Sequence, residues 1–459
     1  MNIIVVGCGK IGKTIIDSLS AEGHDVTAVD SSSAALEEVK NVYDIITVCG
    51  NGADPDTLKD AQADNAELLV AVTNSDEINM LCCYFAKRIG AAHTIARVRN
   101  TDYNEKSIDF MRRELNISMT INPEYLAAKE LFNLLKLPSA TKIESFSSRR
   151  FEMIEMKLKP GSVLDGVKLS ELRSKYKQHF LVCAVQRDSE VFIPDGNFVL
   201  RTGDKIGLTA APSEITKLFK ELKALQKQAK NIIIFGGSRT SYYLARRLLS
   251  AGSTVKIIEQ NQKRCEDLSE LLPSASVSLG DGAQQEILEE EGIRSADAFV
   301  ALTGIDEENI LISFYASSRG VPKVISKVNR TELGLIAEKM GLESIISPRK
   351  LIADVLVQYA RALQNSMGST VETLYKLMDS NVEALEFKVG PDFSATDIPL
   401  KDMKLRKNIL IAGIIRGKDI IIPSGGDVIR HDDRVVVISA AGKLNDLSDI
   451  LKQQKGILS

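Results

Sequence analysis

The feature that most constrains the fold of this chain is an internal repeat. Residues 2–7 (NIIVVG) recur as residues 231–236 (NIIIFG), and Asp30 recurs as Glu259, both at a shift of 229 residues. Further pairs at this shift or at 230 are Asp204 with Asp433, Thr73 with Thr303, Asp76 with Asp306, and Asn79 with Asn309. Because nearly one offset persists along all 459 residues, we interpret the chain as a tandem duplication of a unit about half its length.

The first part of each unit alternates short β-branched runs with helical stretches. In the first unit we expect helices at about residues 10–21 and 77–89, and strands at residues 3–6, 26–29, 45–48, 68–72 and 94–98. This alternation predicts a Rossmann-like, doubly wound parallel sheet with helices on both faces. The second part has closely spaced strands and turns, which predict a small α+β lobe. The predicted fold class is therefore α/β, a Rossmann-like domain and a small α+β lobe in tandem duplication.

Four domains with connecting helices follow from this division. The predicted boundaries are 1–123 and 231–348 for the Rossmann-like domains, and 143–228 and 368–453 for the small lobes. Amphipathic stretches beginning at Pro123 and Pro348 predict one arm helix per unit, since Pro is favoured at the first helical position. We interpret the Lys-rich helix after residue 211 as a linker that reaches Lys230 and makes few contacts.

Composition argues against several classes of function. The chain has 58 Lys and Arg against 61 Asp and Glu, a net charge of -3, whereas nucleic-acid binding usually requires a basic surface. Its six cysteines form no C-x-x-C pair, so we expect no disulfide scaffold, no zinc site and a reducing cytoplasm. We also expect no signal peptide and no membrane crossing, because no run of about 18 apolar residues occurs. Any membrane role must then depend on a partner.

A glycine motif lies between the first predicted strand and helix. Residues 7–12 read GCGKIG, where Gly7 permits a tight turn, Gly9 lets backbone approach a pyrophosphate, and Gly12 lets the helix pack on the strand. Phosphates then meet N–H groups at the positive end of the helix dipole. Asp30 follows Gly12 by 18 residues and is placed to bind a ribose diol, which favours NAD(H) or an adenosine nucleotide over NADP. A purely structural turn is the alternative.

The second copy of this motif is degraded. Residues 236–241 read GGSRTS, so Ser238 and Ser241 replace the second and third glycines. Ser238 restricts the approach of backbone to a phosphate, although its hydroxyl and Arg239 offer other contacts. Glu259 keeps the ribose acid. We predict nucleotide binding here too, with a ligand that can differ from that of the first half; a second half that does not bind is the alternative.

Polar residues follow two later strands. Thr73 and Asn74 come after the fourth predicted strand, and because ligands of open α/β sheets lie outside the carboxyl ends of strands, we expect both beside the nucleotide. Helix N-capping, with Asp76 in the first turn, is the alternative. Arg97 is predicted to reach a phosphate from the same edge, with Lys327 as its counterpart, unless it is an ordinary surface cation.

Evident catalytic signatures are missing. No G-x-S-x-G or H-E-x-x-H motif occurs, and we expect Cys82 and Cys83 to pack within a helix. A nucleotide site without an obvious acid, base or substrate domain favours sensing, so we do not expect an enzyme. An NAD-dependent dehydrogenase is the alternative, and it requires a proton-transfer group beside the nicotinamide.

A doubled Rossmann-like domain, each copy followed by a small α+β lobe, resembles the regulator-of-potassium-conductance (RCK, or KTN) family. The resemblance covers essentially the whole chain and is carried by the GCGKIG loop, Asp30, the TNSDE stretch at residues 73–77, the weakened loop at Gly236, Glu259, and the IPDG and IPSG turns. Its specificity lies in the tandem order, since many dehydrogenases share the glycine motif. The nucleotide-binding positions that it implies are Gly7, Cys8, Gly9, Lys10, Ile11, Gly12, Asp30, Thr73, Asn74, Arg97, Gly236, Gly237, Ser238, Arg239 and Glu259.

The resemblance also implies a function. Members of this family are cytoplasmic, bind NAD(H) and ATP or ADP, assemble into a ring and gate a separate potassium-translocating membrane subunit. For this chain it implies a homo-oligomeric ring, a tetramer of tandem chains, that lies on the inner face of the plasma membrane through its Trk- or Ktr-type partner and serves K+ uptake. Catalytic residues, metal ligands and nucleic-acid partners are not implied. An accessory subunit of another ion transporter is a further alternative.

Overall fold

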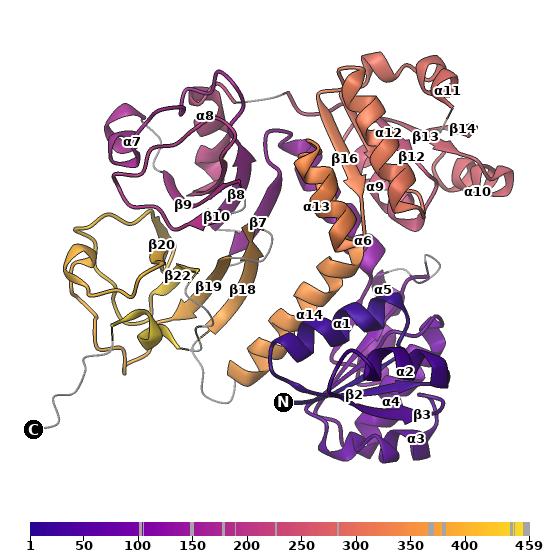
Figure 1. The fold of residues 1–459 in the computed structure, drawn as a ribbon. Helices are drawn as coiled ribbons and strands as arrows, with labels where there is room; N and C mark the ends of the chain where they lie inside the picture. The colour runs from indigo at the N-terminus through magenta and orange to yellow at the C-terminus, as the bar shows by residue number, and fades with distance from the viewer. Residues whose placement is uncertain are drawn as a thin grey trace, which may run out of the picture.

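A computed structural model gives the fold of the chain (Figure 1). It describes residues 1–100, 103, 105–146, 151–176, 180–188, 190–224, 227–281, 284–365, 371–378, 382–440, 444 and 446–452. These residues form two parallel sheets and two antiparallel sheets. The predicted fold class, a duplicated Rossmann-like domain with a small α+β lobe, is confirmed.

The first α/β domain contains a six-stranded parallel sheet of order β3-β2-β1-β4-β5-β6. Its strands are β1 (Asn2–Val6), β2 (Asp25–Asp30), β3 (Ile46–Cys49), β4 (Leu68–Ala71), β5 (His93–Arg97) and β6 (Met119–Ile121). Its helices are α1 (Lys10–Ala21), α2 (Ser33–Lys40), α3 (Pro55–Asp60), α4 (Asp76–Ile89) and α5 (Glu105–Glu114), with a 3-10 turn at Ala63–Asn65. The apolar run in β1 is buried on both faces, as a central parallel strand requires.

The second α/β domain repeats this architecture, with the sheet order β14-β13-β12-β15-β16-β17. Its strands are β12 (Asn231–Phe235), β13 (Thr254–Glu259), β14 (Ser276–Leu279), β15 (Ala298–Ala301), β16 (Lys323–Lys327) and β17 (Ile345–Ile346). Its helices are α9 (Arg239–Ser250), α10 (Gln262–Leu271), α11 (Gln285–Glu290), α12 (Asp306–Ser318) and α13 (Thr331–Lys339), with a 3-10 turn at Ile293–Ser295. In both domains the strand order reverses beside the first strand, where open α/β sheets bind ligands.

Each small lobe is a five-stranded antiparallel sheet, of order β10-β9-β11-β8-β7 in the first and β18-β19-β22-β20-β21 in the second. The first has β7 (Lys142–Phe146), β8 (Phe151–Lys157), β9 (Phe180–Arg187), β10 (Glu190–Phe192) and β11 (Lys205–Ala210), with α7 (Leu169–Lys175) and α8 (Pro212–Glu221). The second has β18 (Val371–Leu377), β19 (Val382–Lys388), β20 (Ile409–Arg416), β21 (Asp419–Ile421) and β22 (Arg434–Ser439), with 3-10 turns at Leu400–Asp402 and Leu447–Ile450.

The repeated aspartates of the small lobes are structural. Asp204 is buried and forms a two-point ion pair with Arg187, both N–O distances being 2.8 Å. Asp433 does the same with Arg416, at 2.9 and 2.8 Å. Such bidentate pairs fix geometry strongly, so this part of the repeat reflects the fold of the lobes.

The two arm helices, α6 (Pro123–Lys136) and α14 (Pro348–Asn365), exchange partners between the halves. Helix α6 packs on α9 of the second α/β domain, α14 packs on α1 of the first, and the arms also contact one another. Figure 1 shows both arms running between the α/β domains and the small lobes. Each half is therefore built partly around the arm of the other.

The cores follow this exchange. One core joins α6 and the first small lobe to the second α/β domain, and another joins α14 and the second small lobe to the first. A third core lies between the two small lobes, where a side chain at Gly413 would come within 2.7 Å of the Phe151 ring. Burial of each leucine or isoleucine stabilises the fold by roughly 1.5–3 kcal/mol.

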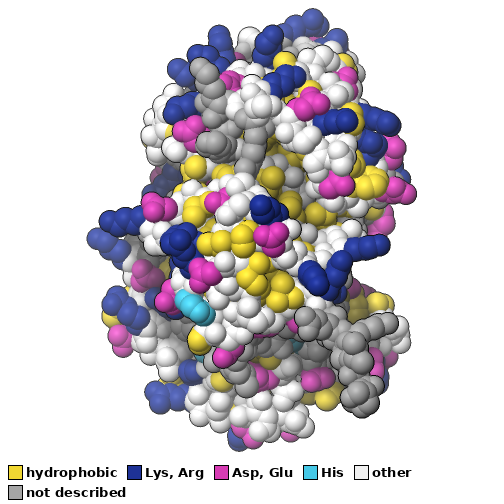
Figure 2. Space-filling model, turned by 90° about the vertical axis from the view of Figure 1, so that its left-hand side faces the viewer, with side chains coloured by type: hydrophobic (Ala, Val, Ile, Leu, Met, Phe, Trp, Pro, Cys, Tyr) yellow, Lys and Arg dark blue, Asp and Glu magenta, His cyan; other side chains and the backbone are white. Residues whose placement is uncertain are grey.

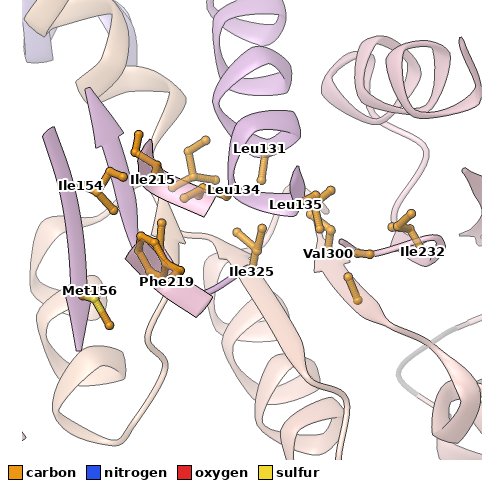
Figure 3. Packing of buried hydrophobic residues seen from close by; sticks show 14 of the residues in the cluster. Leu131, Leu134, Leu135, Ile154, Met156, Ile215, Phe219, Ile232, Val300 and Ile325 are labelled. Carbon is orange, nitrogen blue, oxygen red and sulfur yellow. The ribbon is translucent and has the colours of Figure 1, made fainter. Parts of the chain in front are cut away.

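The prediction that the segment after residue 211 is a linker with few contacts is wrong. Helix α8 ends at Glu221, and its side chains Ile215 and Phe219 are buried in the core that α6 and the first small lobe share with the second α/β domain. Figure 3 shows these two side chains in the same cluster as Leu134 and Ile325. The Lys-rich composition marks only the exposed face of this helix, while the apolar positions repeat at helical spacing.

The small lobes form one side of the molecule. Figure 2 shows hydrophobic side chains near the middle of this side, with Lys and Arg interspersed with Asp and Glu around them. Among the residues that the structure describes, no helix is both long enough and apolar enough to span a bilayer.

Candidate nucleotide-binding sites

The first glycine loop has the backbone that the motif predicts. Gly7 adopts φ +100°, and a side chain there would come within 2.9 Å of the Thr73 backbone nitrogen. A Cβ at Gly12 would lie 1.8 Å from the Gly7 carbonyl oxygen. Both positions therefore require glycine for the turn and for the packing of α1 on β1.

The start of α1 is open at Gly9. This residue precedes the helix without any side-chain cap, and a Cβ there would meet no atom within 4 Å. The first N–H groups of α1 are thus available to an anion, whose charge the helix dipole favours. Lys10 begins the helix and is exposed, whereas Ile11 is partly buried and packs against the core of the first α/β domain.

Asp30 is fixed at the end of β2 next to this loop. Its two carboxylate oxygens accept hydrogen bonds from Cys8 N at 2.6 Å and from Ser32 N at 2.8 Å. Each oxygen keeps a second lone pair, so the carboxylate can still bind a ribose diol. Burial, together with the charge of Asp30, raises the pKa of the Cys8 thiol to about 12. Cys8 therefore offers the site its backbone and not a reactive thiolate.

Thr73 lies against the glycine loop, held by a buried amide. Asn79 Oδ1 accepts from Thr73 N at 2.8 Å and from Thr73 Oγ1 at 2.7 Å, while Asn79 Nδ2 donates to Arg97 O at 2.9 Å. Asn309 repeats these contacts with Thr303 and with the Lys327 carbonyl. The repeated polar pattern therefore ties together the carboxyl ends of two neighbouring strands.

Helix capping accounts for part of the TNSDE stretch. Ser75 caps α4 by accepting from Ile78 N at 3.2 Å, whereas Asp76 instead accepts from the backbone nitrogens of Arg99 and Asn100, both at 2.7 Å. Asn74 is exposed. Its contact with a nucleotide stays a prediction.

Arg97 is buried, so the alternative that it is an ordinary surface cation is wrong, while its contact with a phosphate stays a prediction. It is 3% exposed, and its Nη2 donates to the Thr73 carbonyl. Burial, with a smaller effect from the charge of Arg99, lowers its pKa to about 10, against the opposing charges of Glu124 and Asp76. The side chain remains cationic near neutral pH. Its counterpart Lys327 is partly buried and donates to Leu302 O at 3.2 Å.

The second loop opens onto a cavity of about 510 Å³. Gly237 N donates to Glu259 Oε2 at 2.6 Å, which repeats the contact of Cys8 with Asp30. A Cβ at Gly237 would come within 2.8 Å of the end of the Leu268 side chain, so a larger residue here would require that side chain to move. Besides the loop and Glu259, the cavity is lined by Asn261, Lys263, Arg264, Asp267, Asp281 and Glu308.

The two serines of this loop bond to their own backbone. Ser238 Oγ accepts from Ser241 N at 3.2 Å and thereby caps α9, while Ser241 Oγ donates to Gly236 O at 2.5 Å. One N–H group at the start of α9, that of Ser241, is therefore already paired with Ser238, whereas the start of α1 has no side-chain cap. Arg239 is exposed as the first residue of α9.

Glu124, which the sequence motifs do not reveal, lies between the two sites. It stands in the first turn of α6, and its Oε2 is buried without a hydrogen-bond partner. Its charge raises the pKa of Arg97 in the first domain and of Lys327 in the second, in both cases against the larger effect of burial. Arg239 also lies close enough to act on Arg97. The one signal in the sequence is an acid directly after the Pro at a helix start.

A second pattern outside the predicted motifs is the P-loop spacing of residues 7–14 (GCGKIGKT). In a P-loop the Lys and Thr bind phosphate and Mg²⁺. Here Lys13 pairs with Glu38, and Thr14 Oγ1 donates to Lys10 O at 3.0 Å within the helix. The geometry therefore supports the dinucleotide-type loop over a P-loop. Among the described residues, no cluster of His, Cys, Asp and Glu is placed to hold a metal ion.

Comparison with protein families gives two matches, each occurring twice. The TrkA-N domain matches residues 3–123 and 232–348, and the TrkA-C domain matches residues 153–223 and 384–452. The chain is 32% identical over 444 residues to the Trk system potassium uptake protein TrkA of Vibrio alginolyticus, covering 95% of each chain. It is 30% identical over 454 residues to a TrkA homolog of Archaeoglobus fulgidus, covering 98% of this chain and all of that one.

Solved structures share the fold. The GsuK channel bound to NAD superposes with a TM-score of 0.63 at 16% identity, covering 96% of this chain and 77% of that chain. The GsuK RCK domain gives the same TM-score and identity, with 96% and 92% covered. A GsuK structure bound to ADP gives a TM-score of 0.51 at 13% identity, with 80% and 69% covered.

Proposed function

Since this chain belongs to the TrkA family, we propose that it is a nucleotide-sensing regulatory subunit that gates a potassium-translocating membrane protein for K+ uptake. The observation that carries the proposal is the exchange of arms: α6 packs on the second α/β domain and α14 on the first. A conformational change at either glycine loop would thus be transmitted to an arm helix that belongs to the other half of the chain. The relatives named above are potassium uptake proteins.

The proposed ligands are NAD(H), ATP and ADP. The open start of α1 and the fixed Asp30 carboxylate support a nucleotide with a pyrophosphate in the first site. GsuK, which shares the fold, has been solved with NAD and with ADP. The residues proposed to bind are those predicted from the sequence, with Cys8 acting through its backbone.

Discrimination between ATP and ADP is proposed to arise where the two α/β domains meet. Glu124, whose Oε2 is buried, and Arg239 both act electrostatically on Arg97 there. A third phosphate adds negative charge that Arg97 and Arg239 would attract and Glu124 would repel. Binding of ATP in place of ADP would therefore change which of these groups lie close together. Because Glu124 stands in the first turn of α6, the start of that helix would shift as well.

The nucleotide effect must be a difference in affinity between two conformations of the assembly. A coupling of roughly 1–3 kcal/mol per site is usual, whereas reversing a 1:99 population takes about 5.5 kcal/mol. Several sites in one ring would therefore have to act together. The site occurs twice within the chain and again in each subunit of the proposed ring, which supplies the several sites that are needed.

Assembly into a homo-oligomeric ring is supported by exposed apolar side chains at matching places on the two α/β domains. Leu81 on α4 is 45% exposed and its counterpart Leu311 on α12 is 70% exposed. Phe110 on α5 and Ile336 on α13 are also exposed. Such faces mark interaction sites, and we propose that copies of this chain cover them in a tetramer held at the inner face of the plasma membrane by its partner.

Regulation is favoured over catalysis by the family, whose members named above are not described as enzymes. Dehydrogenase activity is tested by incubating the protein with NADH and carbonyl substrates; turnover would favour that alternative. An accessory role for another ion transporter is tested by copurification from membranes, in which the membrane protein that copurifies with the chain is identified.

The function itself is tested by K+ flux in proteoliposomes that contain the cognate Trk-type membrane subunit. We expect flux to depend on this chain and to differ among ATP, ADP and NADH. Flux that is the same with and without the chain, at every nucleotide, would contradict the proposal.

A further inference from the structure

The two glycine loops differ in the space they leave for phosphate. A Cβ added at Gly9 would have no atom within 4 Å, and nothing caps α1. At the matching Ser238 the side chain fills this space, and its hydroxyl accepts from Ser241 N at 3.2 Å. A pyrophosphate needs that space and those N–H groups.

The serine side chains also stabilise one another in this arrangement. The Ser238 and Ser241 hydroxyl oxygens lie 2.9 Å apart, and Ser241 Oγ donates to the Gly236 carbonyl at 2.5 Å. Displacing Ser238 would break the helix cap and one of these hydrogen bonds. A diphosphate therefore competes with bonds that the second loop already makes, while the first loop has no such competitor.

The charge of the second cavity disfavours a chain of phosphates as well. Its acids are Glu259, Asp267, Asp281 and Glu308, against the bases Lys263 and Arg264. Arg264 Nε already donates to Gly237 O at 2.6 Å. Each added phosphate brings negative charge into a cavity whose lining has more acidic than basic side chains, which disfavours binding. Glu259 can still bind a ribose diol.

We propose that the second site is selective for a nucleoside carrying no more than one phosphate, such as adenosine or AMP, while the first site takes the di- and triphosphates and NAD. The proposal rests on the nucleotide-sensing function above and assigns separate ligands to its two sites. The chain would then respond to two different signals, the level of a nucleoside monophosphate and that of a dinucleotide or triphosphate, through one pair of exchanged arms.

The test is calorimetric titration of the full chain with AMP, ADP and NAD. Asp30→Asn weakens the ribose contact of the first site and isolates the second, and Glu259→Gln does the reverse. In Asp30→Asn we expect AMP to bind at least about tenfold more tightly than ADP or NAD. Adding Ser238→Gly and Ser241→Gly, which restore the glycines of the first loop, should raise ADP affinity by about tenfold, because the competing hydrogen bonds are then lost.

The reciprocal exchange is the matched control. Gly9→Ser places a side chain where the structure leaves open space, so the variant should fold normally and lose ADP affinity in the Glu259→Gln background. The proposal is overturned if Asp30→Asn binds ADP as tightly as AMP, if it binds no AMP, or if the glycine substitutions leave ADP affinity unchanged. Absence of any nucleotide from both the wild-type sites would instead overturn the sensing function itself.

Discussion

The Arg361 guanidinium on α14 and the Glu22 carboxylate at the end of α1 form an ion pair of 2.6 Å between the two halves of the chain. Arg361 is 11% exposed and Glu22 is 6% exposed, and Arg361 also binds Glu383 of the second small lobe at 3.0 Å. One side chain thus joins the first α/β domain, the second arm and the second small lobe.

Replacing Arg361 should destabilise the protein substantially. Arg361→Met leaves two largely buried carboxylates without their cation, and breaking a buried pair in this way costs about 3–5 kcal/mol. Urea unfolding measures the loss. The triple variant Arg361→Met, Glu22→Gln, Glu383→Gln should recover most of it, and a single variant as stable as the wild type would contradict the structure here.

Two glycines of the first loop should respond differently to the same substitution. Gly12→Ala places Cβ 1.8 Å from the Gly7 carbonyl oxygen, so we expect a loss of at least about 1–3 kcal/mol in folding free energy. Gly9→Ala meets no atom within 4 Å and should keep stability while losing nucleotide affinity. Thermal unfolding and calorimetry separate the two effects; equal stability of both variants would be inconsistent with this loop.

Arg97→Ala should reduce the preference between ATP and ADP. Arg97 is the buried cation that acts on Glu124 and Arg239. Loss of its charge-assisted contact to the third phosphate should lower the affinity for ATP by about tenfold, with a smaller effect on the affinity for ADP. The exposed Arg88 on the neighbouring helix provides the control variant Arg88→Ala. Unchanged discrimination in Arg97→Ala would remove this residue from the mechanism.

Lys323 predicts a pH dependence of stability. Its Nζ donates to the carbonyls of Pro138 and Ala140 at 3.0 and 2.7 Å and to Ser344 Oγ at 2.9 Å. Burial lowers its pKa from 10.5 to about 7. Because the unfolded chain then holds more protons between these values, this group makes stability rise with pH from about 7 to 10.5.

The variant Lys323→Met isolates that contribution. The free energy of unfolding, measured in urea at several pH values between about 7 and 10, should rise less steeply for the variant than for the wild type. The comparison uses the slope of the unfolding free energy against pH and not its absolute value, since the variant also loses three hydrogen bonds. Parallel profiles for the two proteins would show that Lys323 keeps an ordinary pKa when folded.

The repeat and its periodicities predict the local architecture well, because each unit carries its own pattern. The apolar run at residues 3–6 lies within β1, and the predicted helix at 10–21 coincides with α1. The predicted boundaries of the domains stay a prediction. What the pattern does not determine is which half each arm contacts: an amphipathic helix needs an apolar partner, and both α/β domains offer one.

The same reasoning explains the errors at individual residues. Arg97 ends a strand, and the sequence alone does not distinguish a buried side chain from an exposed one, since its burial depends on tertiary packing. Glu124 acts on Arg97 and on Lys327 only because the fold brings residues from both α/β domains near the start of α6. Helix α8 resembles a linker in sequence because its charged residues are prominent, although three apolar side chains suffice to bury one face.

In the proposed function, occupancy of the first glycine loop controls the transporter. The most direct test compares wild type with Gly9→Ala in K+ flux through proteoliposomes containing the Trk-type membrane subunit, at matched concentrations of ATP and ADP. We expect a nucleotide-dependent flux for the wild type and a flux independent of nucleotide for the variant, which folds but leaves no space for the phosphates. Equal nucleotide responses in the two proteins would contradict this control by the first loop.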